Sequence, residues 1–418
     1  MLTRDPSCQD DFDSTSLDTD EALARILAHC PEVTGSERVH LRAALGRILA
    51  APIDSPVDVP QHTNSAMDGY ALRSDDLPKR GTARVSVIGD AFAGRPFDGS
   101  VAPGTAVRIM TGAAMPDGAD LVVMQEHVVR DGDVIEFDGA HKRGQNVRAA
   151  GEDLERGDRV LERGHRLGPA ELGLVASLGI GEVSVRRRVR VAYFSTGDEL
   201  RSIGEPLGRG EIYDSNRYTL HGMLHEMGVE VIDLGVVRDR RDAVEAALRE
   251  AAALADVVIT SGGVSVGEAD YIKEVLAAIG EVRFWKVAMK PGRPLAFGTI
   301  GAARFFGLPG NPVSVMVTFS QFVAPALRQM GGGRQQVTLT IRARTTERLK
   351  KRPGRMEFQR GILGRGADGE LEVTPTGDQG SGILHSMSRA DCFIVLPIGS
   401  DGVAAGEDVV VQPFLGRL

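Results

Sequence analysis

Cysteine is scarce in this chain of 418 residues: Cys8, Cys30 and Cys392 lie far apart and show no C-x-x-C spacing. This argues against a disulfide framework and against a zinc site, so a bound metal is expected to be a hard cation on oxygen ligands. The chain also lacks an apolar run near the roughly 18 to 20 residues that span a bilayer. Its acidic start lacks the apolar core of a signal peptide. We therefore expect a cytoplasmic protein with no membrane association.

Positive charge is in deficit, with 49 Lys and Arg against 57 Asp and Glu and a formal net charge of −8. Nucleic-acid binding needs a surplus of basic residues, so no nucleic-acid partner is expected. The chain has no G-x-x-x-x-G-K-[ST] motif, and no G-x-G-x-x-G stands between a strand and a helix with an acid further on. These absences exclude a P-loop enzyme and a dinucleotide-binding domain. The length predicts about two to four domains.

Four regions differ in pattern along the chain. Residues 19–30 and 37–50 carry apolar residues at helical spacing and predict two surface-packed helices, whereas 166–185 predicts a helix followed by a strand. Short β-like runs between Gly, Pro and Asp predict an inserted β domain. The predicted regions are a discontinuous helical linker region at 1–54 and 148–187, an inserted β domain at 55–147, an α/β domain at 188–331 and a β domain at 332–418.

The α/β region alternates continuous apolar strands with helical segments, as in VRVAYFST followed by NRYTLHGMLHEMG. This pattern predicts a parallel sheet whose two faces are covered by helices. After Gly331 the pattern is all β, which fits a small barrel or sandwich.

Glycine-bearing loops follow three strands of the α/β region: STGDEL, TSGGVSVGEAD and GLPGNP. The carboxyl ends of parallel strands face one edge of the sheet, so we expect these loops to converge on a single crevice. Glycines let backbone N–H groups approach an anion, and the N-terminus of the following helix adds partial positive charge. The sequence therefore predicts an anion site that needs no P-loop lysine.

Acidic residues in the same loops, Asp198, Glu199, Glu268 and Asp270, would repel a phosphate. A Mg²⁺ ion that bridges carboxylates and phosphate oxygens removes the conflict. The alternative is that each acid caps a helix. Their convergence on one sheet edge favours a Mg²⁺-phosphate site.

Basic residues gather in two places. The Pro-Gly turn in WKVAMKPGRP presents Lys286, Lys290 and Arg293 together, with no acid between them. The segment 342–365 contains nine basic and two acidic residues, Arg360 among them. In an acidic protein such clusters suit a polyanionic small molecule or an oxyanion. For the second cluster, a solvated β surface is an equal alternative.

Sequence blocks in order along nearly the whole chain resemble the MoeA family of molybdopterin molybdenumtransferases, whose animal and plant relatives include the E domain of gephyrin. The blocks are NSAMDGYA, RIMTGA, VVMQE, GQNVR, GEDL, ASLGI, FSTGDEL, YDSNR, SGGVSVGEADY, MKPGRP and GLPGNPVS. The resemblance implies a helical linker region, an inserted β domain, a MogA-like doubly wound α/β domain and a C-terminal β-barrel. It also implies an elongated homodimer in which one subunit's inserted domain approaches the α/β crevice of the other.

The resemblance implies an enzyme that uses adenylylated molybdopterin and molybdate, with Mg²⁺, to insert molybdenum into the dithiolene and release AMP. An upstream MogA-like adenylyltransferase and downstream molybdoenzyme maturation proteins are the implied partners. Two alternatives stay open. The α/β domain alone is similar to the ATP-consuming adenylyltransferase of the same pathway, and a gephyrin-like scaffold would bind a partner without turnover.

Carried over block by block, the resemblance assigns roles to individual residues. Asp68 and Thr111 become a contribution from the second subunit, with Asp153 in support. Glu199, Asp239 and Asp270 become the acids that hold Mg²⁺ and substrate, and Glu199 and Asp270 are the implied metal ligands. The residues implied around the oxyanion or substrate phosphate are Ser265, Lys286, Lys290, Arg293, Arg360 and Ser381, and Pro309 and Pro312 shape the adjoining loop.

Two positions depart from the family pattern. Arg293 stands where many relatives have lysine, and because a guanidinium and an ammonium present donors differently, a different molybdate contact is expected. His62 and Thr63 replace a Phe-Asp pair, which concerns local packing more than chemistry.

Overall fold

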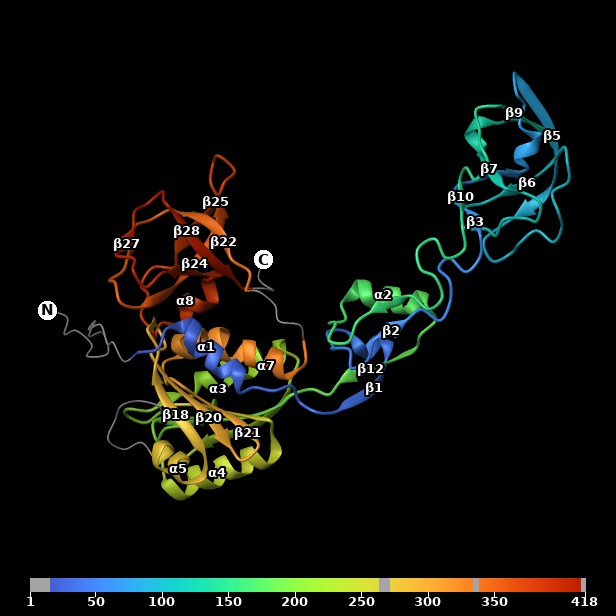
Figure 1. The fold of residues 1–418 in the computed structure, drawn as a ribbon. Coiled ribbons are helices and arrows are strands. Elements are labelled where there is room, and N and C mark those ends of the chain that lie inside the picture. The colour runs from blue at the N-terminus through green and yellow to red at the C-terminus, as the bar shows by residue number, and fades with distance from the viewer. Residues whose placement is uncertain (1–15, 263–270, 334–337, 415–418) are drawn as a thin grey trace. The chain divides into compact units, whose positions relative to one another are not determined.

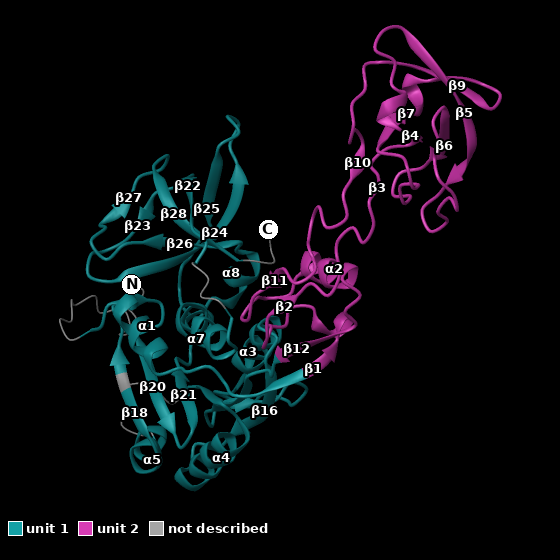
Figure 2. Cartoon of the chain, turned by 45° about the vertical axis from the view of Figure 1, so that its right-hand side comes forward, with its two compact units in different colours: residues 1–37, 186–418 teal, residues 38–185 magenta. Residues whose placement is uncertain are grey.

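The computed structural model describes residues 16–262, 271–333 and 338–414 (Figure 1). It divides the chain into two compact units, one of residues 1–37 and 186–418 and one of residues 38–185 (Figure 2). In the described ranges, no helix is both long and apolar enough to cross a membrane.

A six-stranded sheet with the order β16-β13-β17-β21-β20-β18 forms the centre of the larger unit. Its strands are β13 (Arg190–Thr196), β16 (Glu230–Val237), β17 (Val257–Ser261), β18 (Glu281–Lys286), β20 (Pro294–Ile300) and β21 (Ala303–Leu308). Its helices are α1 (Thr19–Ala28), α3 (Ser215–Glu226), α4 (Arg241–Leu254), α5 (Tyr271–Ile279), α6 (Pro312–Thr318) and α7 (Ala324–Met330), with a π-helical turn, Phe319–Val323, between the last two. The short strands β14 (Leu200–Arg201) and β15 (Ile212–Tyr213) lie outside this sheet.

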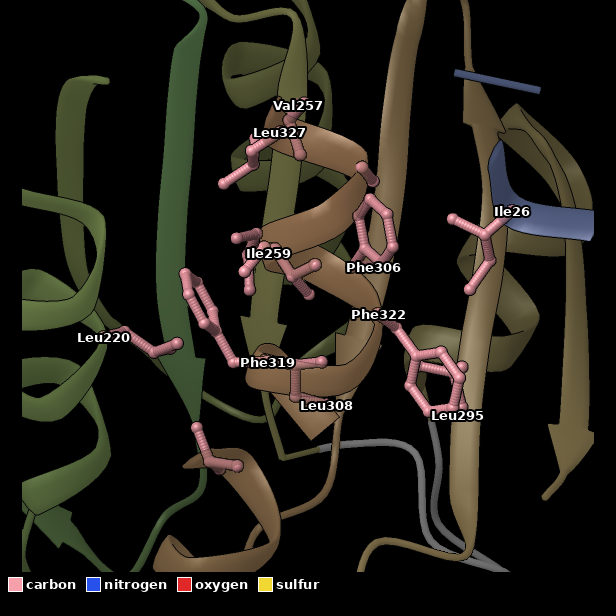
Figure 3. Close-up of a cluster of buried hydrophobic side chains, with 14 of the residues drawn as sticks. Ile26, Leu220, Val257, Ile259, Leu295, Phe306, Leu308, Phe319, Phe322 and Leu327 are labelled. Atoms are coloured by element: carbon pink, nitrogen blue, oxygen red, sulfur yellow. The ribbon is translucent and has the colours of Figure 1, made fainter. Parts of the chain in front are cut away.

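Both faces of the sheet are buried. Along β13, Val191 and Tyr193 pack into one core, whereas Ala192 and Phe194 pack into another, because successive side chains of a strand point to opposite faces. The first core is completed by α1, α3, α6 and α7, and the second by α4 and α5. Figure 3 shows part of the first core, where Phe319 lies against the strands. Helical cover on both faces confirms the prediction.

The predicted parallel sheet is antiparallel at one edge. β13, β16, β17 and β21 run parallel, but β20 is antiparallel to β21 and β18 is antiparallel to β20. Only a turn of Gly301 and Ala302 separates the paired residues Ile300 and Ala303. So short a connection can join only antiparallel strands, whereas a parallel crossover needs a dozen or more residues. The sequence analysis did not identify β20 as a strand.

The C-terminal region of the larger unit is a closed five-stranded barrel, which confirms the β-barrel prediction. Its main strands are β22 (Ile341–Thr345), β24 (Met356–Arg365), β25 (Leu371–Pro375), β26 (Cys392–Leu396) and β28 (Asp408–Pro413), with β23 (Leu349–Lys350), β27 (Gly402–Val403) and α8 (Leu384–Arg389) beside them. The sheet closes because β24 pairs with both β25 and β26. The strand β19 (Met289–Lys290) leaves the α/β domain and pairs with β24, so the two domains share backbone hydrogen bonds.

The smaller unit contains the predicted β domain. Its six-stranded sheet has the order β7-β4-β6-β5-β9-β8. The strands are β4 (Gly69–Leu72), β5 (Thr82–Ala91), β6 (Thr105–Ile109), β7 (Leu121–Met124), β8 (Val129–Asp131) and β9 (Val134–Asp138), and the pairs β3 (Asn64–Ser65) with β10 (Val147–Arg148) and β2 (Ile53–Asp54) with β11 (Arg159–Leu161) precede and follow it in the chain. The helix α2 (Pro169–Ser177) completes the unit, and the Glu171 side chain accepts a hydrogen bond from the Gly168 N–H at its start.

One of the two predicted N-terminal helices is present and one is not. The helix predicted over 19–30 is α1, capped by Asp18, whose side chain accepts from the Asp20 N–H. The helix predicted over 37–50 is wrong: the chain forms β1 (Ser36–His40), which pairs with β12 (Glu182–Arg186), and then a 3-10 turn. Gly46 then takes φ 75°, which a helix does not allow. Strand pairing and this left-handed residue override the helical spacing of the apolar side chains.

An ion pair between Arg187 and Asp256 ties the segment before β13 to the segment before β17. The Arg187 Nη1 and Nη2 atoms donate to the two carboxylate oxygens at 2.7 and 2.8 Å, and the Arg190 N–H donates at 2.8 Å. Burial by itself raises the pKa of Asp256, but the hydrogen bonds from Arg187 and Arg190 outweigh it and hold the pKa below the usual value. The ionised carboxylate therefore stabilises the folded state.

We expect Asp256→Asn to lower the free energy of unfolding by about 2 kcal/mol at neutral pH. An acid with a lowered folded-state pKa stabilises fully above its unfolded pKa, about 3.9, and loses that contribution as the pH falls through the folded value. The difference between variant and wild type in urea unfolding curves should therefore begin to shrink below about pH 5 and be lost as the pH falls through the folded-state pKa. Glu245→Gln, which removes an exposed helical pair with Arg249, should cost less than about 0.5 kcal/mol. If the stability loss of Asp256→Asn does not change with pH, the ionised Asp256 carboxylate is not its cause.

Candidate functional site

The carboxyl edge of the parallel strands brings together loops that are far apart in sequence. The loop after β13, the loop after β16, the start of α3, the end of β17 and the loop before α6 all lie at this edge, because their strands run parallel. β20 runs antiparallel to β21, so the Lys290–Arg293 turn that precedes β20 also lies there. We call this set the edge site: residues 196–199, 214–216, 238–240, 261–262, 290–293 and 309–312.

A hydrogen-bonded network connects the loops of the edge site. The Asn216 Nδ2 atom donates to Ser261 Oγ at 2.8 Å and to the Gly310 carbonyl oxygen at 2.6 Å. Asp214 is buried and caps α3, where it accepts from the Arg217 N–H at 3.1 Å. These contacts hold the ends of β17 and β21 against the start of α3.

Glycine is required where β17 ends. Gly262 takes φ 91°, and a Cβ atom there would come within 2.8 Å of the Thr196 carbonyl oxygen. A side chain at this position would therefore push apart the loops after β13 and β17. Gly262 thus lets the two loops stay in contact.

Three carboxylates gather beside this network, and we call Asp198, Glu199 and Asp239 the edge acids. The Asp239 N–H donates to Asp198 Oδ1 at 3.3 Å. Burial first, and then the charges of Asp198 and Glu199, raise the pKa of Asp239. In the described part of the chain no three acidic, histidine or cysteine side chains form a complete set of metal ligands, so a metal ion here would need further oxygen donors. The predicted residues Ser265 and Asp270 lie outside the described residues.

The predicted basic residues of the α/β domain lie at the same edge. Lys290 is partly exposed, and its Nζ atom lies 3.4 Å from Glu357 Oε1. Gly292 takes φ 100°, and a Cβ atom there would come within 2.6 Å of Thr318 Oγ1, so this glycine lets the turn pack on α6. Arg293 is partly buried, and its carbonyl oxygen accepts from the Val287 N–H at 2.8 Å. Lys286 is exposed at the end of β18.

Arg360 is buried and holds a loop of the barrel. Its Nε atom donates to Ser386 Oγ at 2.9 Å, and its Nη atoms donate to the Gln379 and Gly380 carbonyl oxygens, each at 3.0 Å. Burial lowers the pKa of Arg360 to about 10, so the guanidinium is still charged at neutral pH. The described bonds give Arg360 a supporting role, and its contact with an anion stays a prediction.

The loop that Arg360 holds reaches the edge site. The Ser381 carbonyl oxygen accepts from the Val313 N–H at 3.1 Å, at the start of α6. Ser381 therefore lies next to the segment that contains the predicted residues Pro309 and Pro312. Pro309 is buried and Pro312 is the first residue of α6.

In the smaller unit, Asp68 and Thr111 are in direct contact. The Thr111 N–H and Oγ1 both donate to Asp68 Oδ1 at 2.7 Å. These two hydrogen bonds lower the pKa of Asp68, so an exposed carboxylate is held ionised in a fixed orientation. The Asp153 N–H donates to the Val59 carbonyl oxygen at 3.0 Å. The approach of these residues to an α/β domain stays a prediction.

Three protein-family models match successive parts of the chain. They describe the MoeA N-terminal region (domain I and II) at residues 17–179, a probable molybdopterin binding domain at 192–329 and the MoeA C-terminal region (domain IV) at 342–414. The chain belongs to the MoeA family. This membership makes it an enzyme of the transferase class.

Individual MoeA relatives are similar over almost the whole chain. A molybdopterin molybdenumtransferase of Haemophilus influenzae is 47% identical over 95% of this chain and 98% of its own length. Gephyrin of Dictyostelium discoideum is 34% identical, over 90% of this chain but only 59% of gephyrin. The crystal structure of the molybdopterin biosynthesis moeA protein from Pyrococcus horikoshii OT3 has a TM-score of 0.84 and 31% identity, with 96% of this chain and all of that chain covered.

The sequence analysis gave no role to two residues that the structure of this chain places in or beside the edge site. Asn216, in the block YDSNR, joins two loops through its amide. Glu357 is a buried carboxylate beside Lys290. The Asp-Ser-Asn run precedes a helical segment and is typical of a helix cap, and Glu357 lies within a basic segment. Neither pattern predicts the contacts that these two residues make.

Proposed function

We propose that this MoeA-family enzyme inserts molybdenum from molybdate into adenylylated molybdopterin, with Mg²⁺ and with release of AMP. The observation that carries the proposal is that the edge acids and the Lys290–Arg293 turn lie at one edge of the same sheet. An anionic substrate that also binds a cation needs both kinds of group. The curated relatives are named for transfer of molybdenum to molybdopterin, which agrees with the proposal.

The edge acids fit Mg²⁺. They offer carboxylate oxygens, and the pKa of Asp239 is raised first by burial and then by the charges of Asp198 and Glu199, a repulsion that a cation would relieve. Mg²⁺ is typically held by one or two carboxylates together with phosphate oxygens and water, so Glu199 and Asp270 would supply the protein ligands. When bound, Mg²⁺ neutralises charge that develops on the phosphates during cleavage of the pyrophosphate link.

The residues of the chain bind and orient the two substrates. Lys290 and Arg293 provide charged donors for the molybdate oxyanion or for a phosphate. Asn216 keeps the loops around this position together, and Arg360 holds the Ser381 loop beside α6. The proposal includes a homodimer in which the inserted domain of a second copy supplies Asp68 and Thr111. An upstream MogA-like adenylyltransferase would deliver the adenylylated pterin, and downstream molybdoenzyme maturation proteins would receive the product.

AMP release from adenylylated molybdopterin, measured with Mg²⁺ and with or without molybdate, tests this function. We expect molybdate-dependent release that stops when a chelator removes Mg²⁺. Consumption of ATP in place of AMP release would favour the adenylyltransferase. No release from folded protein in either condition would favour a scaffold that binds a partner without turnover.

A further inference from the structure

We propose that Glu357, a residue of the C-terminal barrel, is a positioning residue that holds the Lys290 ammonium in place for its anionic ligand. The inference rests on the proposed function, because it assigns Lys290 to molybdate or phosphate binding. It adds a residue from another domain that acts through Lys290 and does not itself touch the substrate.

The pair forms where the two domains share strand hydrogen bonds. Lys290 on β19 is directly opposite Glu357 on β24 in the parallel ladder. Glu357 Oε1 lies 3.4 Å from Lys290 Nζ, and the exposed fraction of the side chain is 7% for Glu357 but 43% for Lys290. The carboxylate is therefore inside the protein while the ammonium is open to a ligand.

The Glu357 carboxylate is fixed by a second contact. Gln359 Nε2 donates to Glu357 Oε2 at 3.1 Å and to the Lys350 carbonyl oxygen at 3.0 Å. A buried carboxylate is costly without a charged partner. The fixed negative charge therefore attracts the flexible Lys290 side chain to one position.

The Glu357 carboxylate also offsets the charge of other cations near it. Lys351 is buried, and its Nζ atom donates to the carbonyl oxygens of Arg352, Ile398 and Ser400 at 3.1 to 3.2 Å. Burial lowers the pKa of Lys351; the Glu357 charge opposes this, whereas the charges of Lys290 and Arg355 add to it. Without Glu357, the Lys290 ammonium would be repelled by the charge of Lys351 with no carboxylate to hold it in place.

The geometry also leaves Lys290 able to bind. An ammonium has three N–H donors. Glu357 accepts from one of them, and the Lys290 side chain is 43% exposed, so two donors are left for an oxyanion. The barrel thereby contributes to anion binding through one buried carboxylate.

A double-mutant cycle on the molybdate dependence of AMP release tests this role. Glu357→Gln keeps the size of the side chain and removes its charge, and we expect the KM for molybdate to rise about tenfold while kcat changes less than about twofold. In a Lys290→Ala background the same change should alter the KM less than about twofold, because the residue through which it acts is gone. Glu357→Asp, which keeps the charge, should restore part of the affinity. Glu372→Gln, at a barrel carboxylate paired with Arg344, is the matched control and should leave the KM unchanged.

Acylation of the Lys290 amine, followed by mass spectrometry, gives a reading that needs no turnover. Loss of the Glu357 charge releases the Lys290 amine from its ion pair and should speed its acylation about threefold at pH 8, while the exposed Lys79 is unchanged. Equal acylation of Lys290 in both proteins, or an equal rise in KM with and without Lys290, would overturn the inference. A wild-type protein that releases no AMP would instead overturn the proposed function, and the acylation rates would still test the Lys290–Glu357 contact.

Discussion

Asp239→Asn is expected to lower turnover by at least about 100-fold while the folded state becomes no less stable. Burial and the charges of Asp198 and Glu199 raise the pKa of Asp239. The folded state therefore binds this proton more tightly than the unfolded state, and ionisation of Asp239 costs stability at pH values above the raised pKa. An amide at this position removes that cost and also removes a charge that would hold Mg²⁺ and substrate. Function and stability are expected to move in opposite directions, as is common for charges gathered at an active site.

The test compares AMP release with thermal unfolding of the same variant. Asp242→Asn is the matched control, because Asp242 lies close by in the first turn of α4 but is bonded to the Arg240 side chain. The control should keep its turnover. If Asp239→Asn keeps wild-type turnover, the proposed role of Asp239 in the reaction is wrong. If the variant also has a clearly lower melting temperature, Asp239 has a structural role.

Arg360→Ala is expected to reduce the free energy of unfolding by about 3 to 5 kcal/mol. The residue is 1% exposed, and its truncation would remove the donor to the Gln379 carbonyl oxygen and to the Ser386 hydroxyl, and one of two donors to the Gly380 carbonyl oxygen. It would also leave a cavity in the barrel. Arg360→Lys should recover only part of the loss, because an ammonium cannot reproduce the planar arrangement of the guanidinium donors.

The same substitution should also affect the edge site. The loop that Arg360 holds contains Ser381, whose carbonyl oxygen accepts from the Val313 N–H. Unfolding in urea measures the stability loss, and Arg365→Ala is the control on the same strand, since Arg365 is exposed and donates only to the Gly369 carbonyl oxygen among its described bonds. The control should cost less than about 0.5 kcal/mol. A loss of less than about 1 kcal/mol for Arg360→Ala would contradict the supporting role.

Most of the architecture could be predicted from local pattern. Alternating apolar strands and helices identified the α/β domain because burial on both faces makes stretches such as VAYF of β13 apolar throughout. The predicted helix over 37–50 failed because pairing of β1 with β12 depends on a segment far along the chain. The antiparallel strand β20 was missed for a related reason: strand direction is set by the turns at its ends, and apolar composition does not report it.

The sequence by itself determined the fold class, the family and the kind of site expected. Glycine-bearing loops, acidic residues and a basic turn can be recognised from the residue types and their order along the chain. Tertiary structure alone decided which of these groups meet. It placed Glu357 of the barrel against Lys290, used Asn216 to join two loops, and buried Arg360 within hydrogen bonds to its own domain. The physical reason is that the burial and hydrogen bonds of a side chain depend on neighbours far away in the sequence, as Lys290 and Glu357 are with a separation of 67 residues.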